Sequence, residues 1–355
     1  MSIAREIVGF AMKAGSSDIH LEEGSPIAVR VNSDIKISPQ TLGKEEMNNL
    51  LLELLGAEKN REFNETGDLD TSIGLEGLSR LRINAYVANE KRCLTLRLLP
   101  NDLPNWQDLG LPDSFINLSK LHRGLVLCTG PTGSGKSTSL AAFINCMLDT
   151  QRRHILTIED PIEFIFNHTA NSIIHQREVK RDTNSFSTAL RAALREDPDV
   201  IYIGEMRDLE TIQLAITAAE TGHLVLGTLH TSSASQTIDR MIDVFPPQQQ
   251  QQVRVQLSSS LIGVISQTLC KTRDKQRKLA AEILINNTAI SNLIRESKSS
   301  QIYSQIQVGA KFGMQTLEQS LFDLFDKGLI NKEEAFSKSN RQSVLQSIIE
   351  NNDNN

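Results

Sequence analysis

The stretch GPTGSGKSTS, residues 130–139, has the residue types and spacing that can hold a phosphate group. It fits the pattern GxxxxGK[ST], and apolar runs flank it on both sides, GLVLCT before and LAAFINCML after. Between a strand and a helix, such glycines let backbone N–H groups turn toward phosphate oxygens, and the helix N-terminus adds positive potential. A flexible Gly/Ser connector is the alternative, and both flanks disfavour it.

Within this loop, Lys136 is expected to neutralise the β- and γ-phosphates of a nucleotide, and the Ser137 hydroxyl to ligate Mg²⁺. ATP and Mg²⁺ are therefore the expected ligands. The residues predicted to bind the nucleotide are Gly130, Pro131, Thr132, Gly133, Ser134, Gly135, Lys136, Ser137 and Thr138.

Carboxylates follow two other apolar runs. Glu205 comes directly after the run DVIYIG, where a carboxylate can hold the Mg²⁺ water shell or polarise the attacking water, unless it is only a solvated loop residue. The segment HILTIEDPIEF offers Glu159, Asp160 and Glu163. Hydrolysis needs one carboxylate to orient water toward the γ-phosphate, and the spacing does not say which of the three does so.

Two histidines, His223 and His230, bracket the apolar run LVLGTL. Their separation is odd, so on a regular strand they point to opposite faces, which argues against a shared metal ion. His230 follows the run and can reach a γ-phosphate. Core packing is the simpler interpretation for each histidine taken alone.

Arginines stand on both arms of a predicted hairpin over residues 78–100. A turn centred between Asn89 and Glu90 pairs Ile83 with Leu96 and so sets Arg82 opposite Arg97. Like charges opposite each other destabilise a sheet. An anion beside them, such as the nucleotide of a neighbouring subunit, would explain the pair; the alternative is a solvated edge or salt bridges to Glu90, Asp68 or Asp70.

The chain has 355 residues, of which 39% are hydrophobic and 23% charged, a composition typical of globular domains with ample material for cores. The net charge of −6 disfavours nucleic-acid binding, which depends on Lys and Arg. The four scattered cysteines indicate neither a zinc ribbon nor a disulfide framework. No apolar run is long enough to span a membrane and no signal peptide is recognisable. These features predict a cytoplasmic protein.

The apolar runs predict an α/β fold. Helical and strand patterns alternate over residues 1–102 as in a small α+β domain, and prolines mark a linker over 103–118. Residues 119–280 are predicted to form an ATPase core with a mostly parallel sheet covered by helices. The chain has a helical pattern from about residue 248, which predicts a helical C-terminal region over 281–355 with a disordered tail, ENNDNN.

Taken in order, these motifs resemble one family, the PilT-type retraction ATPases of type IV pili, within the secretion-ATPase superfamily. The stretches that carry the resemblance are SDIHL, the phosphate loop, TIEDPIEF, REDPDVIYIGEMRD, TGHLVLGTLHTSSA, AISNLIRE and GMQTLEQSL. The resemblance implies a PAS-like N-terminal domain, a RecA-like ATPase domain and a helical C-terminal region, assembled as a homohexamer.

The resemblance also implies residue roles. Glu163 becomes the general base, Glu205 the acidic Walker B residue, and His223 and His230 parts of a histidine motif. Arg82 and Arg97 look like interface arginines. The implied partners are an inner-membrane pilus platform protein, with the chain peripheral to that membrane, and related pilus ATPases.

The function predicted on these grounds is ATP hydrolysis that powers type IV pilus retraction. No tetracysteine motif of the pilus-extension and type II secretion relatives is present, but Ser291 replaces the first arginine of the usual AIRNLIRE. Alternatives are a pilus-assembly or secretion-system ATPase, a non-catalytic ATP-binding regulator, and a nucleic-acid translocase, which the acidic balance disfavours.

Overall fold

The computed structural model describes residues 2–31, 34–75, 77–100 and 102–353. The chain divides into two compact units. The first comprises Met1–Asp102 together with Pro161–Ile165, and the second comprises Leu103–Asp160 and Phe166–Asn355.

The first unit is a six-stranded antiparallel sheet with two helices, in the strand order β3-β2-β1-β6-β5-β4. Its elements are α1 (Ile3–Lys13), β1 (Ser16–Glu22), β2 (Pro26–Val31), β3 (Asp34–Thr41), α2 (Lys44–Thr66), β4 (Asp68–Gly74), β5 (Arg80–Ala88) and β6 (Lys91–Leu99). The apolar faces of α1 and α2 share one core with the sheet. This confirms the predicted α+β arrangement.

The β5–β6 hairpin has the predicted register. Ile83 pairs with Leu96, and both are fully buried. The turn residues Asn89 and Glu90 have φ values of 50° and 63°. Positive φ at both residues is what a two-residue type I′ turn requires, and the twist of this turn matches that of the strands it joins. Since alternate residues face opposite sides of a sheet, this register places Arg82 opposite Arg97 on the face away from the core.

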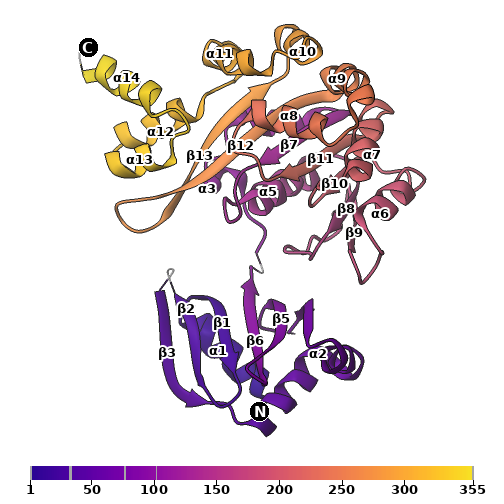
Figure 1. The fold of residues 1–355 in the computed structure, drawn as a ribbon, viewed down its shortest axis with the longest axis vertical. Helices are drawn as coiled ribbons and strands as arrows, with labels where there is room; N and C mark the ends of the chain where they lie inside the picture. The colour runs from indigo at the N-terminus through magenta and orange to yellow at the C-terminus, as the bar shows by residue number, and fades with distance from the viewer. Residues whose placement is uncertain (1, 32–33, 76, 101, 354–355) are drawn as a thin grey trace. The chain divides into compact units, whose positions relative to one another are not determined.

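The second unit is a seven-stranded sheet with helices around it (Figure 1). Its elements are α3 (Trp106–Leu109), α4 (Asp113–Ile116), η1 (Asn117–Lys120), β7 (Gly124–Thr129), α5 (Lys136–Thr150), β8 (His154–Glu159), β9 (Ile173–Glu178), α6 (Phe186–Ala193), β10 (Val200–Ile203), α7 (Leu209–Glu220), β11 (Leu224–Leu229), α8 (Ala234–Asp243), α9 (Pro247–Ser260), β12 (Leu261–Lys271), β13 (Arg277–Ile285), α10 (Thr288–Arg295), η2 (Ser299–Gln301), α11 (Ile302–Gln307), η3 (Ala310–Phe312), α12 (Leu317–Asp326), α13 (Lys332–Lys338) and α14 (Gln342–Asp353).

The strand order is β13-β12-β7-β11-β10-β8-β9, and every neighbouring pair is parallel except β12 with β13. The central strands β7, β10 and β11 are buried along their whole length. Such strands need helices on both faces, which is why they appear in the sequence as unbroken apolar runs. The predicted α/β class and mostly parallel sheet are confirmed.

The prediction of continuous helix after residue 248 is wrong for two segments, because β12 and β13 form an antiparallel hairpin. β12 also pairs in parallel with β7. A strand buried against a sheet shows an apolar run, such as LIGVI at the start of β12, that periodicity cannot distinguish from a buried helix. The helices α12, α13 and α14 then gather beside this hairpin (Figure 1).

The expectation of a disordered tail is wrong for residues 350–353, which continue α14; residues 354–355 lie outside the described residues. Leu345 and Ile349 of α14 are buried in a cluster with Leu321 of α12. Packing of an apolar face commonly outweighs weak helix propensity, and here it holds a helix that runs into a polar end.

Residues 103–118, predicted as a linker, group with the second unit. Phe115 of α4 is fully buried, and its ring centroid lies 5.1 Å from that of Phe143 in α5. Most of this stretch is therefore folded onto the helix that follows the phosphate loop.

Candidate functional site

The phosphate loop, residues 130–135, connects β7 to α5, and Lys136 is the first residue of that helix. Gly130 and Gly135 have φ values of 145° and 87°, which favour glycine. A Cβ on Gly130 would lie 2.3 Å from the backbone oxygen of Gln267, so no larger residue fits there. The loop leads directly into the N-terminus of a 15-residue helix, where unpaired N–H groups and the helix dipole attract an anion.

The Lys136 ammonium lies over this loop. Its Nζ donates to the backbone oxygens of Gly130 at 2.8 Å and Pro131 at 3.1 Å. The same nitrogen lies 3.4 Å from Nδ1 of His230. The backbone carbonyls of the loop thus hold the Lys136 ammonium against the loop. A phosphate oxygen bound there can replace these carbonyls as the acceptor.

Gln267 of β12 contacts the phosphate loop through its side chain. Sequence analysis did not identify this residue. Its Nε2 donates to the Ser134 oxygen at 2.7 Å, and its Oε1 accepts from the Cys128 thiol at 3.3 Å. Burial raises the pKa of Cys128 to about 12, so the thiol stays protonated and remains a donor at neutral pH. Gln267 was missed because its segment was predicted to be helical.

Glu205 and His230 stand after the neighbouring strands β10 and β11. His230 Nε2 lies 2.8 Å from a carboxylate oxygen of Glu205, and the Arg207 guanidinium contacts the same oxygen. The Glu205 side chain is only 22% exposed. Lys136, His230 and Glu205 therefore form one continuous set of contacts beside the phosphate loop. Arg207 adds a positive charge that the sequence analysis did not assign to the site.

His223 lies away from this set. Its Nδ1 is 3.0 Å from the backbone oxygen of Ala218, at the opposite end of β11 from His230. The two histidines are thus separated by the length of a strand. Of the two, only His230 lies beside the phosphate loop, 3.4 Å from Lys136 Nζ.

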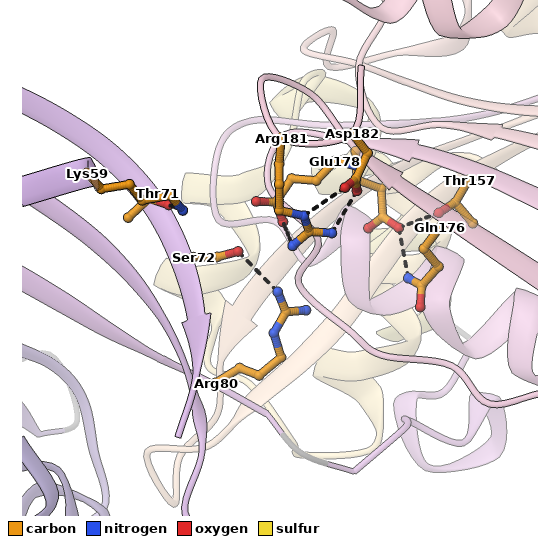
Figure 2. Close-up of polar contacts among 10 residues, drawn as sticks. Lys59, Thr71, Ser72, Arg80, Thr157, Gln176, Glu178, Arg181 and Asp182 are labelled. Carbon is orange, nitrogen blue, oxygen red and sulfur yellow. Dashed lines mark hydrogen bonds and ion pairs between the residues drawn. The ribbon is translucent and has the colours of Figure 1, made fainter. Parts of the chain in front are cut away.

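The three carboxylates after β8 have different surroundings. Glu159 is buried and accepts hydrogen bonds from Thr157 Oγ1 at 2.7 Å and Gln176 Nε2 at 3.1 Å, with both donors labelled in Figure 2. Asp160 is exposed, and Glu163 is half-buried in the segment that groups with the first unit. The bonds to Glu159 hold it inside the sheet, so Asp160 and Glu163 remain the candidates to orient water.

An ion cluster follows β9. Arg181 donates to both carboxylate oxygens of Asp182, at 3.0 and 2.7 Å, and lies 3.4 Å from Glu178 (Figure 2). The hydrogen bond from Arg181 is the main reason that the pKa of Asp182 lies below its ordinary value. The cluster fixes the turn after this edge strand.

A cleft of about 220 Å³ opens beside the start of α5. Its walls combine the end of the phosphate loop with the β12–β13 hairpin and α3. The lining residues are Asp108, Leu109, Gly135, Thr138, Ser139, Gln267, Leu269, Arg277, Lys278 and Leu279. Leucine side chains on two sides and a few polar groups suit a flat, partly apolar group.

Each arginine of the hairpin pair has a carboxylate partner. Arg82 binds Asp70 through two nitrogens, at 3.2 and 2.6 Å, and Arg97 Nε binds Asp18 at 2.8 Å. The salt bridge to Asp70 was one of the predicted alternatives. These carboxylates offset the like-charge repulsion, so an anion is not needed to explain the pair. The Arg97 side chain nevertheless remains 60% exposed.

Comparisons with known proteins identify the relatives of this chain. Residues 1–352 match the family model described as type II/IV secretion system protein. The chain is 49% identical over 335 residues to the type IV pilus retraction ATPase PilT of Pseudomonas aeruginosa, covering 94% of this chain and 97% of that protein. It is 48% identical over 309 residues to a twitching motility protein of Neisseria gonorrhoeae, covering 86% and 82% respectively.

Among solved structures, the fold matches that of the pilus retraction motor PilT with bound ADP. The TM-score is 0.91 at 47% sequence identity, over 98% of this chain and 99% of that one. At this similarity the correspondence includes both units and the region of the phosphate loop.

The Asp18–Arg97 ion pair should stabilise the fold in a pH-dependent way. Burial alone would raise the pKa of Asp18, but hydrogen bonds from Arg97 and Ser17 outweigh it, and the pKa lies below the ordinary value of 3.8. A carboxylate with a lowered pKa stabilises the fold above its unfolded-state pKa and loses this effect as the pH falls further. Asp18→Asn should therefore cost about 1 kcal/mol at pH 7, with the difference shrinking toward pH 3.

Urea unfolding, monitored through hydrogen exchange of the backbone amides in β1 and β6, measures this loss of unfolding free energy at pH 7 and pH 3. Asp70→Asn is the matched control, because Asp70 pairs with the other arginine but is more exposed. Its cost should be roughly half as large or less. A cost for Asp18→Asn that is independent of pH would contradict the ion-pair account.

Proposed function

Because this chain belongs to the type II/IV secretion system protein family, we propose that it is an ATPase whose hydrolysis drives retraction of a type IV pilus. The observation that carries the ATPase proposal is the contact set of Lys136, His230 and Glu205 beside the phosphate loop. The names of the Pseudomonas and Neisseria relatives support retraction and twitching motility as the work performed.

ATP binds with its phosphates on the loop from Gly130 to Thr138. Lys136 moves from the loop carbonyls to the β- and γ-phosphates, and the α5 N-terminus contributes its positive dipole. The cleft beside Gly135 receives the nucleoside, with the base against Leu269 and Leu279.

The side chains near the loop suit Mg²⁺ as a cofactor. The Ser137 hydroxyl, at the second position of α5, and the Glu205 carboxylate are the oxygen donors that this ion prefers. When bound, Mg²⁺ neutralises charge on the β- and γ-phosphates.

Hydrolysis joins a water oxygen to the γ-phosphorus. It breaks the bond between the γ-phosphorus and the oxygen that bridges to the β-phosphate, and ADP leaves with that oxygen. Glu163 orients this water and accepts its proton, while Glu205 holds His230 and Arg207 close to the developing charge. His230 contacts both Lys136 and Glu205, so it can sense whether the γ-phosphate is present.

The chain works as a homohexamer in which Arg82 and Arg97 of one subunit reach the nucleotide of its neighbour. Arginine supplied in trans stabilises transition-state charge in other phosphate-loop enzymes. The exposed guanidinium of Arg97 can exchange part of its contact with Asp18 for a phosphate oxygen.

The ring acts at the cytoplasmic face of the inner membrane on a pilus platform protein, together with related pilus ATPases. No helix among the described residues is long and apolar enough to cross a membrane. Ser291, which stands where the family motif has arginine, has its hydroxyl oxygen 2.8 Å from the Ser258 backbone oxygen and 3.1 Å from Asn286 Oδ1, and its one proton is donated between these two acceptors. The serine thus joins α10 to the end of α9.

The ATPase proposal predicts a separation of binding from hydrolysis in Glu205→Gln. The neutral side chain leaves the phosphate loop intact, so affinity for a fluorescent ATP analogue should stay within about threefold, while steady-state phosphate release falls at least about a hundredfold. Glu210→Gln is the matched control: this glutamate lies on α7 and pairs with Arg191, and its loss should leave the rate unchanged. Full activity of Glu205→Gln would remove Glu205 from the reaction.

The shared-site proposal predicts complementation between two inactive variants. Lys136→Ala disables a subunit's own loop, and Arg97→Ala deprives its neighbour of an arginine. In rings reassembled from an equal mixture, about a quarter of the interfaces combine an intact loop with an intact arginine, so phosphate release should return to about a quarter of the wild-type rate.

The matched control for Arg97→Ala is Arg92→Ala, which removes another arginine of the same hairpin, one that donates to Asn64. This control should remain active. If Arg97→Ala alone turns over ATP like the wild type, its role is confined to the salt bridge with Asp18.

A further inference from the structure

The segment between β11 and α8 is short, so His230 depends on where α8 begins. β11 ends at Leu229, Ser233 is the N-cap of α8, and α8 starts at Ala234. The Ser233 hydroxyl accepts from the backbone N–H of Gln236 at 3.3 Å. Only residues 231–233 separate His230 from the helix, and a displacement of the helix start must therefore move the imidazole as well.

Glu282 of β13 fixes the start of α8. The backbone N–H of Ala234 is one of the donors that a helix N-terminus cannot satisfy internally. It donates to Glu282 Oε1 at 2.7 Å, and Glu282 is only 3% exposed. A buried acceptor on the β12–β13 hairpin thus holds the first turn of α8. This helix follows residues 230–233, here called the His230 segment.

A chain of hydroxyls attaches the same segment to the phosphate loop. Thr231 and Thr237 share a hydrogen bond of 2.7 Å, and the Thr237 hydroxyl donates to the Ser233 backbone oxygen at 2.7 Å and lies 3.5 Å from Thr129 Oγ1. Thr129, which precedes Gly130, shares a bond of 2.8 Å with Ser266 of β12. The His230 segment therefore has two attachments, one to the end of β7 and one to Glu282.

Burying the Glu282 carboxyl costs desolvation free energy that packing alone would not justify. Burial raises its pKa to about 7; the Ala234 N–H lowers it, the negative charge of Glu318 raises it, and the charge of Arg341 lowers it. Glu318 is itself buried and accepts a hydrogen bond from Tyr303 at 2.9 Å. An apolar residue would avoid this cost but would leave the Ala234 donor unsatisfied.

We propose that Glu282 is a positioning residue for ATP hydrolysis: through Ala234 and the start of α8, it holds His230 against Lys136 and Glu205. This inference rests on the proposed ATPase function. It assigns to the β12–β13 hairpin a part in the chemistry, because β12 supports the phosphate loop through Gln267 and β13 supports the His230 segment.

The proposal has a pH signature. Above about pH 7 Glu282 is ionised, and a carboxylate is a stronger acceptor than a neutral acid and complements the positive end of α8. Below that pH it accepts only as a neutral group, like a glutamine. The charged groups that act on it, among those the structure describes, are Glu318 of α12 and Arg341 just before α14.

The test compares Glu282→Gln, which keeps a neutral acceptor, with Glu282→Leu, which has none. Phosphate release by Glu282→Leu should show kcat lowered about tenfold with the KM for ATP within about twofold, because the phosphate loop is untouched. The ratio of wild-type to Glu282→Gln kcat should rise about threefold between about pH 6 and pH 8.5.

Asn331→Ala is the matched control for loss of a helix-capping acceptor. Asn331 accepts from the N–H of Glu334 at the start of α13 and does not contact the His230 segment. This variant should lose stability without a change in kcat. Equal kcat values for wild type and a folded Glu282→Leu would overturn the proposal, as would a wild-type to Glu282→Gln ratio that is flat with pH.

A second readout does not depend on turnover. In nucleotide-free protein, the imidazole NMR signal of His230 should shift in Glu282→Leu, which lacks the acceptor for the Ala234 N–H, while that of His223 stays in place. An unchanged His230 signal contradicts positioning by Glu282. If the wild type releases no phosphate, the proposed function fails, and the His230 signal still decides whether Glu282 positions that side chain.

Discussion

Parallel pairing of the central strands is the constraint on which the site depends. β7, β11, β10 and β8 run side by side in one direction, so their carboxyl ends meet at one edge of the sheet. The phosphate loop leaves β7, His230 leaves β11 and Glu205 follows β10. Residues that are 94 positions apart, such as Lys136 and His230, come within 3.4 Å only because the strand order brings these ends together. Parallel order requires crossover helices, and those helices bury the strands.

The β12–β13 hairpin adds a second constraint at the same edge. Through Gln267 it satisfies a carbonyl inside the phosphate loop, and through Glu282 it satisfies an N–H at the start of α8. Both are buried polar contacts whose loss leaves an unpaired group. The same hairpin carries the α12–α14 cluster. The β12–β13 hairpin therefore contacts both the phosphate loop and the C-terminal helices directly.

Local patterns in the sequence were sufficient to predict the phosphate loop, the central strands and the register of the β5–β6 hairpin. The last of these followed from alternation and one turn, which set Arg82 opposite Arg97 as found. Gln267, Arg207 and Glu282 were not predicted. Their roles depend on which distant segments become neighbours; Gln267 and Ser134, for example, are 133 positions apart. The apolar run of β12 also gave no sign of strand rather than helix, because a strand buried on a parallel neighbour loses its alternation.

If ATP hydrolysis at this phosphate loop powers pilus retraction, the chain must support twitching motility. In Pseudomonas aeruginosa lacking its own PilT, this chain should restore movement across a surface. The Lys136→Ala variant, produced at the same level, should not restore it, since the loop then lacks its phosphate-binding charge. Failure of the wild-type chain would contradict retraction as its work. Equal restoration by Lys136→Ala would contradict the dependence on ATP hydrolysis.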